Sequence, residues 1–452
     1  KVQAVRAKDP KIFLNITSGT WLSPWWVKYA NTIWMQGADY GYADVPSISP
    51  RDAAITYRDF VLYDDFHNQN QWFPISNLMT HGIIKGNLEM LGGKEEPLDK
   101  FTNEVLLYFA RGVAMWELYI SPDILNDGEW DALGQAMQWA RDRFPTLTST
   151  EMIGGDPTKG QTYGYVHYNG THGVIAVRNP LITENSLRVP LASSLGLDPN
   201  AKNLVLERVY PGRWISPQLY SANDSAQIPL NGYETAIYEL YPLADAKEPL
   251  LAGVPFDVAS NDNGKEMLNV YGSMDGMKLL NADAAKIETA PSGSETTEAP
   301  VENNSIKFSS DKGSIDVGFA TSASVKEGVL SILLTPAGDS PSKKPPRVHL
   351  TIDGVADTAK HERAEDESVS LWYTAKLSTG KHDVIISVES KEQQKSWTGN
   401  ASVWMVCQQQ QSGRTVTLTT TLKPSSRILP PQALPPGIVI KNVKLGEGEI
   451  GG

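Results

Sequence analysis

The residues of this chain that are best suited to chemistry gather near its start, at two polar corners that each follow a short apolar stretch. The first corner lies in residues 15–26 and the second in residues 33–41, which contain the carboxylate of Asp39. A pyranose ring has an apolar C–H face that stacks on indole, and hydroxyls that need polar partners. Aromatic side chains beside a carboxylate therefore predict a carbohydrate site at these corners.

Asp39 is the leading catalytic candidate, because it is expected at the carboxyl end of a strand beside Gly37 and Tyr40. A glycosidase needs one carboxyl group to protonate the leaving oxygen and a second to act as nucleophile or base. An aromatic, partly dry corner would raise the pKa of such an acid toward a useful value. The alternative is that Asp39 only caps the next helix or binds backbone amides, and the spacing alone does not choose between them.

The remaining candidates would contact the substrate rather than react with it. They are Trp21, Trp25, Trp26, Trp34, Tyr40, His81 and Glu117. The three tryptophans of the first corner would offer a stacking platform, although one or two of them could instead pack beneath the loop. His81 could donate to a substrate hydroxyl or serve as a structural partner. Glu117 lies among apolar neighbours, so it needs either a basic partner such as Arg111 or a place in the site.

Composition limits the other possibilities. The chain has 452 residues, a formal net charge of −12 and no basic block, so we expect no nucleic-acid partner. No stretch approaches the roughly 20 apolar residues of a membrane-spanning helix, so no transmembrane segment is expected. The histidines are scattered, Cys407 is the single cysteine, and no glycine loop has phosphate-binding spacing. We therefore expect no metal, no cofactor and no intramolecular disulfide.

The elements that must position the candidates alternate between strands and helices. Strands are expected at residues 11–16, 32–36, 75–80 and 113–120, and helices at residues 51–68, 98–111 and 127–144. Strands separated by helices imply parallel pairing with right-handed crossovers, and four such units make half of a (β/α)8 barrel. The polar corners follow strands, which in a barrel is the catalytic face. Asn126 and Glu129 have the spacing of a capping box for the last helix.

The pattern changes to alternating strands after Pro145. Asn169-Gly170 between two such strands is a hairpin signal. The predicted fold is therefore the second half of a (β/α)8 barrel followed by two antiparallel all-β, sandwich-like domains. Tryptophans in the second of these domains could bind glycans, or they could be the core of a spacer. The expected divisions are residues 1–150 for the barrel half, 151–245 for the first β domain, 246–304 for an irregular connector, 305–428 for the β-sandwich and 429–452 for an extended Pro/Gly-rich tail.

Two motifs resemble a known family. Thr17-Ser-Gly-x-Trp-Leu-Ser-Pro-Trp-Trp and Trp34-Met-x-Gly-x-Asp-Tyr-Gly are similar to the fifth and sixth strands of the α-galactosidase (melibiase) superfamily barrel. The resemblance covers residues 11–245. It implies a retaining glycosidase with two aspartates, in which the nucleophile follows the fourth strand and the acid/base follows the sixth. Asp39 matches the acid/base. The Trp-Leu-Ser-Pro-Trp-Trp corner departs from the Ser-Gly-Gly-Gly-Arg-type corner of the best-known members, which leaves the identity of the sugar open.

The strand that supplies the nucleophile would precede residue 11. Half a parallel barrel exposes unpaired strand edges, so we expect a companion chain or upstream segment to complete it. The resulting prediction is a glycosidase that removes α-linked galactose or N-acetylgalactosamine from glycans, and that is secreted or held in the cell envelope, in the periplasm or at the cell surface. The alternative is a catalytically silent carbohydrate-binding or structural envelope protein built on the same scaffold.

Overall fold

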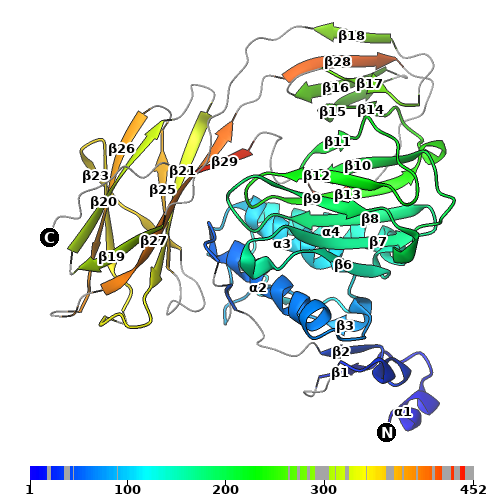
Figure 1. Ribbon diagram of the computed structural model, residues 1–452, viewed down its shortest axis with the longest axis horizontal. Helices are drawn as coiled ribbons and strands as arrows, with labels where there is room; N and C mark the ends of the chain where they lie inside the picture. The colour runs from blue at the N-terminus through cyan, green and yellow to red at the C-terminus, as the bar shows by residue number, and fades with distance from the viewer. Residues whose placement is uncertain are drawn as a thin grey trace.

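The computed structural model describes residues 1–17, 22–34, 41–43, 45–88, 90–262, 265–271, 275–281, 286–290, 305–310, 312–320, 325–342, 344–362, 371–378, 381–392, 395, 397–409, 413–419, 429–431 and 438–442. Helices gather in the first third of the chain, and antiparallel sheets make up the rest (Figure 1). No helix among the described residues is both long and apolar enough to cross a membrane.

The N-terminal part is built on short parallel strands. They are β1 (Asn15–Ile16), β2 (Thr32–Trp34), β3 (Leu78–Met79), β4 (Ile83–Lys85) and β5 (Leu118–Ile120). β1, β2 and β3 form a parallel sheet in chain order, and β4 pairs with β5, also in parallel. Parallel pairing was the expectation for this region, but the two sheets are separate among the described residues, and the barrel half is not confirmed.

These strands are shorter than the sequence pattern predicted. The chain makes a 3₁₀ turn at Ile75–Asn77 directly after Pro74, so β3 begins only at Leu78. β4 was not expected at all, because it follows β3 after only three residues, Thr80-His81-Gly82. The predicted strand at 113–120 is reduced to β5. Short apolar runs carry too little periodicity to fix their ends.

The three predicted helices are confirmed as α2 (Pro50–Tyr63), α3 (Leu98–Ala110) and α4 (Asp127–Asp142). The Ser49 side chain accepts a hydrogen bond from the backbone N–H of Asp52, and Pro50 occupies the first turn of α2, where its missing N–H costs nothing. The capping box of Asn126 and Glu129 is present in both directions. α2 continues as a π-helical turn at Asp64–Asn68, and the short helices α1 (Val2–Lys8) and α5 (Phe144–Leu147) complete the set.

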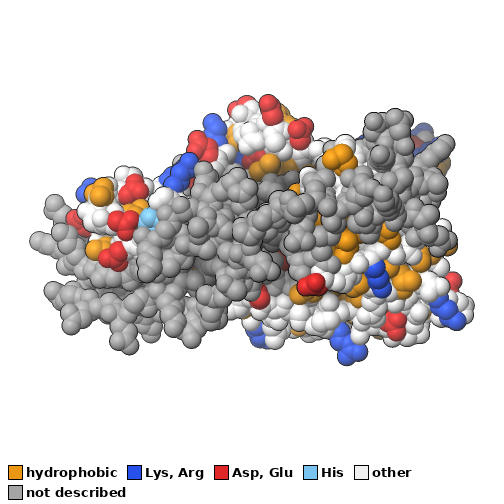
Figure 2. All heavy atoms as spheres, turned by 90° about the horizontal axis from the view of Figure 1, so that it is seen from above, with side chains coloured by type: hydrophobic (Ala, Val, Ile, Leu, Met, Phe, Trp, Pro, Cys, Tyr) orange, Lys and Arg blue, Asp and Glu red, His pale blue; other side chains and the backbone are white. Residues whose placement is uncertain are grey.

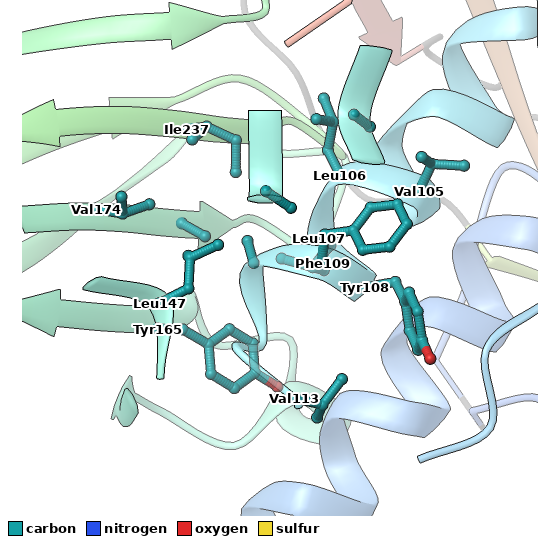
Figure 3. Close-up of a cluster of buried hydrophobic side chains, with 14 of the residues drawn as sticks. Val105, Leu106, Leu107, Tyr108, Phe109, Val113, Leu147, Tyr165, Val174 and Ile237 are labelled. Atoms are coloured by element: carbon teal, nitrogen blue, oxygen red, sulfur yellow. The ribbon is translucent and has the colours of Figure 1, made fainter. Parts of the chain in front are cut away.

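α3 is buried along its length and lies between the other helices and a large sheet (Figures 1 and 3). Its side chains from Val105 to Phe109 share one buried cluster with Tyr165, Val174 and Ile237 of the sheet. Burial of side chains of this size contributes roughly 1.5–3 kcal/mol each. The helical part and the first β part therefore have a common core.

That sheet has ten strands and is antiparallel throughout. In spatial order they are β18 (Lys286–Ala290), β28 (Gly413–Thr419), β16 (Lys265–Tyr271), β15 (Pro255–Asp262), β11 (Arg213–Ile215), β10 (Leu204–Tyr210), β13 (Thr235–Pro242), β8 (His172–Arg178), β7 (Tyr163–Asn169) and β6 (Thr150–Gly154). Two small pairs flank it, β9 (Asn185–Pro190) with β12 (Ser225–Leu230) and β14 (Leu251–Ala252) with β17 (Lys278–Leu279). The predicted hairpin is confirmed: Asn169 pairs with His172, and Gly170 has a φ of 62°.

An irregular connector was expected at residues 246–304, but in the described part of this range the chain forms strands β14 to β18. β15 and β16 pair up to Asp262 and Lys265, and the two residues between them are Asn-Gly in the sequence, a hairpin signal that the prediction overlooked. Residues 413–419 fall within the range 305–428 that is expected to form the β-sandwich. They form β28, which instead joins the ten-stranded sheet beside β16 and β18.

The C-terminal strands form two antiparallel sheets, which we call the two-sheet unit. One contains β19 (Ser305–Ser310), β27 (Trp397–Gln409), β21 (Val325–Pro336), β25 (Leu371–Leu377) and β24 (Lys360–Glu362), with β29 (Ile438–Asn442) beside β27, and the other contains β20 (Lys312–Ala320), β26 (Lys381–Glu389), β22 (Arg347–Ile352) and β23 (Val355–Asp357). Side chains of both sheets share one buried cluster. Trp372, Trp397 and Trp404 are buried, so they are core and not a platform for sugars. β29 lies within the predicted extended tail, and it pairs with β27.

Buried charges join α2 to the ten-stranded sheet. The Asp59 carboxylate accepts hydrogen bonds from Tyr163 at 2.6 Å, Tyr165 at 2.7 Å and the Arg111 Nε at 2.8 Å. The Asp52 carboxylate pairs with Arg178 of β8 at 2.9 Å. Burial alone would raise the pKa of Asp52, but the adjacent Lys100 and Arg178 charges outweigh it and hold that pKa below its usual range. Burying these ions without partners would cost several kcal/mol each, so the pairs fix how helix and sheet meet.

Candidate functional site

An aromatic and ionic cluster lies at the carboxyl ends of the parallel strands β2 and β3. Trp34 is the last residue of β2, and His81 follows shortly after the end of β3. Their ring centroids are 4.2 Å apart, with the planes at 74°. Tyr119 of β5 lies edge-on to His81 at 5.4 Å. His81 is buried, while Tyr119 is exposed, so the cluster extends from the interior to the surface.

The Glu117 carboxylate completes this cluster. Its Oε2 lies 3.1 Å from the His81 Nδ1, within ion-pair distance when the imidazole is protonated, and both side chains are mostly buried. The backbone N–H of Glu117 donates to the Tyr108 hydroxyl at 2.7 Å. The sequence left Arg111 open as the partner of Glu117. Arg111 instead pairs with Asp59. Glu117 is therefore available to the cluster rather than used in a separate ion pair.

Gly82 allows the chain to make this corner. A Cβ atom at Gly82 would lie 1.5 Å from the Glu117 carbonyl oxygen and 3.3 Å from the Tyr108 ring. The β3–β4 corner and the start of β5 thus approach each other more closely than any side chain permits. This contact places His81 and Glu117 side by side.

The tryptophans of the first corner separate into two kinds. Trp25 lies in a 3₁₀ turn, η1 (Pro24–Lys28), and is 74% exposed. Its neighbour Trp26 is partly buried and packs on the main hydrophobic core. The expectation that some of these tryptophans pack while others stay accessible agrees with this arrangement. Trp21, Asp39 and Tyr40 lie outside the described residues, so their roles stay predictions.

Sequence reasoning missed the polar side chains that α2 and α3 contribute beside this cluster. Tyr57, Arg58 and Glu104 line a small cavity together with His81 and Gly82. Burial, reinforced by the positive charge of Arg111, lowers the pKa of Arg58 to about 10. That value still leaves the guanidinium charged at neutral pH.

A signal for these residues was present in the sequence. Arg51-Asp52 and Arg58-Asp59 recur at an interval of about two helical turns, which places both pairs on one side of α2. A charged face of this kind is usually solvated, but all four side chains are buried here. Arg51 is paired with Glu96 at 2.6 Å and with Glu104.

The cluster offers the groups that carbohydrate recognition uses. The half-buried indole of Trp34 presents an apolar surface, and the imidazole and carboxylate offer a donor and acceptors for hydroxyls. Within the described part of the chain, no group of three or more His, Cys, Asp or Glu side chains is placed to hold a metal ion. Figure 2 shows both basic and acidic side chains on the described part of one face of the molecule.

The sequence matches no protein-family model and no curated protein. Some solved structures share part of its shape. An Anoxybacillus α-amylase has 11% identity and a TM-score of 0.33, over 53% of this chain and 55% of that one. A maltogenic α-amylase from Thermotoga neapolitana has 15% identity and a TM-score of 0.30, over 52% and 57%. An isomalto-dextranase from Arthrobacter globiformis T6 has 11% identity and a TM-score of 0.24, over 90% and 62%.

This chain thus spans little more than half the length of the two amylases. None of the three proteins is named as an α-galactosidase, so the resemblance to that superfamily stays a prediction. All three are glycoside hydrolases by name, and at these TM-scores they establish neither a family nor an activity for this chain.

Proposed function

We propose that this chain contributes one part of the active site of a retaining glycosidase. The observation that carries the proposal is the cluster of Trp34 and His81 at the carboxyl ends of the parallel strands β2 and β3, with Glu117, which directly precedes β5, beside His81. In α/β folds that edge is where ligands bind, and the cluster has the mixed apolar and polar character of a sugar site. Asp39 follows β2 in the sequence and is the proposed acid/base.

The proposed reaction uses two carboxyl groups. An aspartate outside this chain attacks the anomeric carbon while Asp39 gives its proton to the glycosidic oxygen, so the bond to the leaving group breaks as the bond to the enzyme forms. Asp39, now ionised, then takes a proton from water. The resulting hydroxide attacks the anomeric carbon and releases the nucleophile, and the sugar leaves with its original anomeric configuration.

The other site residues are proposed to bind the sugar. Trp34 and the exposed Trp25 would stack on ring faces, and Trp21 and Tyr40 would add to this surface from the same corners. His81 and Glu117 would hold hydroxyl groups through the imidazole N–H and the carboxylate oxygens. The proposed sugars are α-linked galactose or N-acetylgalactosamine, and that choice rests on the resemblance of the Asp39 motif.

The fold proposal that accompanies this function is half of a (β/α)8 barrel with two β domains after it. β1 is an edge strand of its sheet among the described residues, and apolar side chains stay exposed beside it, including half-exposed Phe13 and the exposed Val27 and Tyr29. Such an edge and such side chains suit pairing with further barrel strands. We propose a companion chain or upstream segment as the source of those strands, and a secreted or cell-envelope location.

The proposal is tested on the whole native protein with aryl α-galactoside, aryl α-N-acetylgalactosaminide and, as a comparison, aryl α-glucoside. We expect hydrolysis of one of the first two substrates. NMR should show that the sugar is first released with the same anomeric configuration that it has in the substrate. Variant His81→Asn should raise KM by about tenfold, the equivalent of about one hydrogen bond to a charged or polar partner. Binding of these sugars without turnover would contradict the enzymatic proposal and favour a carbohydrate-binding protein.

A further inference from the structure

Three side chains hold the connection between β2 and α2. They come from the ten-stranded sheet region and from the two-sheet unit. Three successive carbonyl oxygens of residues 46–48 each accept one hydrogen bond: the Tyr233 hydroxyl donates to Pro46 at 2.6 Å, the Trp372 Nε1–H donates to Ser47 at 2.9 Å, and the Ser331 hydroxyl donates to Ile48 at 2.6 Å. Donors from three separate segments therefore converge on one short stretch of backbone.

These donors are far apart in the sequence. Tyr233 lies two residues before β13 of the ten-stranded sheet, whereas Ser331 and Trp372 lie in β21 and β25 of the two-sheet unit. All three donors are buried. Ile48 packs in a hydrophobic cluster with Tyr233 and Trp372, which also contains Ile182, Leu333 and Trp404. Ser47 and Ile48 are buried whereas Pro46 is exposed, so both the ten-stranded sheet and the two-sheet unit contact the connection and cover most of it.

The two-sheet unit also touches the connection that follows β4. The Lys360 Nζ lies 3.1 Å from a Glu95 carboxylate oxygen. A Cβ atom on Gly93 would lie 2.6 Å from the Glu362 carboxylate. A cavity of about 650 Å³ lies between these two contacts and the Trp372 contact. The unit thus contacts both the chain that follows β2 and the chain that follows β4.

We infer that Tyr233, Trp372 and Ser331 are positioning residues for the site, and that the two-sheet unit is part of the active-site framework rather than a spacer. The inference rests on the proposed function, because Asp39 shortly precedes residues 46–48 in the sequence. The three donors hold residues 46–48, and the Ser49 cap holds the start of α2 directly after them. Releasing one donor loosens the stretch that carries the proposed acid/base without touching the substrate.

The test uses Tyr233→Phe, which removes one hydroxyl and keeps the ring. Its matched control is Tyr168→Phe, because the Tyr168 hydroxyl of β7 donates to the Pro190 carbonyl of β9 at 2.9 Å, which is also a tyrosine-to-carbonyl bond but lies away from the connection. Hydrogen–deuterium exchange in peptides covering residues 45–55 should be about tenfold faster in Tyr233→Phe, and unchanged in the control. Unchanged exchange in Tyr233→Phe would overturn the inference.

Kinetics give the second readout. A loosened acid/base slows departure of poor leaving groups, which need the proton, more than that of activated aryl groups, which do not. In Tyr233→Phe, kcat should fall about fivefold on an alkyl α-galactoside and less than about twofold on an activated aryl α-galactoside. Equal losses on both substrates would indicate a purely structural role and overturn the inference.

A second variant covers the case in which Tyr233→Phe does not fold. Ser331→Ala removes one donor of the same set, and Ser340→Ala is its control, since the Ser340 hydroxyl donates to the Ser342 carbonyl at 2.9 Å within the two-sheet unit. Faster exchange in residues 45–55 of Ser331→Ala alone supports the inference. If the native protein hydrolyses no glycoside, the proposed function fails, while the exchange comparison still decides whether these donors hold the connection.

Discussion

Acid should weaken this protein through one buried histidine, His167 of β7. The ring is fully buried, and its Nδ1 lies 2.8 Å from the Leu147 carbonyl oxygen and 3.1 Å from the Thr150 hydroxyl. Burial lowers the pKa of His167 from 6.5 to about 4. The unfolded chain therefore takes up a proton near pH 6.5, while the folded protein resists it until about pH 4. The contribution of the neutral, buried His167 ring to the free energy of unfolding is therefore fully present above pH 6.5 and is lost as the pH falls toward 4.

The size of the effect follows from these two pKa values. Between pH 7 and pH 5 the proton affinity of the unfolded state should reduce the free energy of unfolding by about 2 kcal/mol through this group alone. His167→Gln removes the titrating ring and should be less stable than the wild type at pH 7. Because the wild type alone loses the His167 contribution in acid, the difference in stability between the two proteins should narrow by about 2 kcal/mol at pH 5.

Urea unfolding at pH 7, 6 and 5 measures this difference. Thr150→Val is the matched control, because it removes the hydroxyl beside the same ring and leaves the imidazole in place. Its difference from the wild type should stay constant over the same pH range. If the difference for His167→Gln is also constant, burial does not control the protonation of this histidine, and the reasoning is refuted.

Three further predictions concern the site and its support. Gly82→Ala should destabilise the protein by about 3 kcal/mol or more in urea unfolding, because the new Cβ would meet the Glu117 carbonyl oxygen; a loss below about 1 kcal/mol would show that this corner adjusts freely. Trp26→Ala should cost about 3 kcal/mol of stability and Trp25→Ala less than about 0.5 kcal/mol, since only Trp26 packs on the core; equal thermal shifts would contradict this difference. Asp59→Ala should cost about 3–5 kcal/mol, because it leaves the Arg111 charge without its partner in a buried place; an unchanged denaturation midpoint would show that the ion pair does not hold α2 to the sheet.

Local patterns predicted the helices well. The pattern predicts α2, α3 and α4 because their apolar residues recur at helical spacing. The capping-box spacing of Asn126 and Glu129 indicates the start of α4. The hairpin at Gly170 was equally visible, because its signal is contained in two residues. Such features depend on neighbours in the sequence, and these are what a single sequence displays.

Features that depend on distant partners were missed. β28 could not be assigned to the ten-stranded sheet from its own residues, since its partners β16 and β18 lie more than a hundred residues earlier. The charged face of α2 gave no hint of burial, because its partners Arg178 and Tyr163 belong to another part of the chain. Pairing and burial of this kind are decided by tertiary packing rather than by local pattern.

The candidate site was predictable in part. Strand ends and residue types led to Trp34, His81 and Glu117, and the structure brings these three together. The partner of Glu117 was left open, because an ion pair with His81 depends on the close approach at Gly82, which no spacing rule reveals. The sequence also left open which of Trp25 and Trp26 is exposed and which packs on the core. Adjacent residues in a 3₁₀ turn face different sides, but the sequence does not show which side is buried.

The central claim is that Asp39 is the acid/base of a retaining glycosidase, and leaving-group dependence tests it most directly. The measurement compares kcat/KM of the native protein and its Asp39→Asn variant on an activated aryl α-galactoside and on an alkyl α-galactoside. We predict that the variant loses about 100-fold or more on the alkyl substrate, which needs the proton, and about tenfold or less on the aryl substrate. Equal activity of the two proteins on both substrates, or equal loss on both, would contradict the assignment of Asp39.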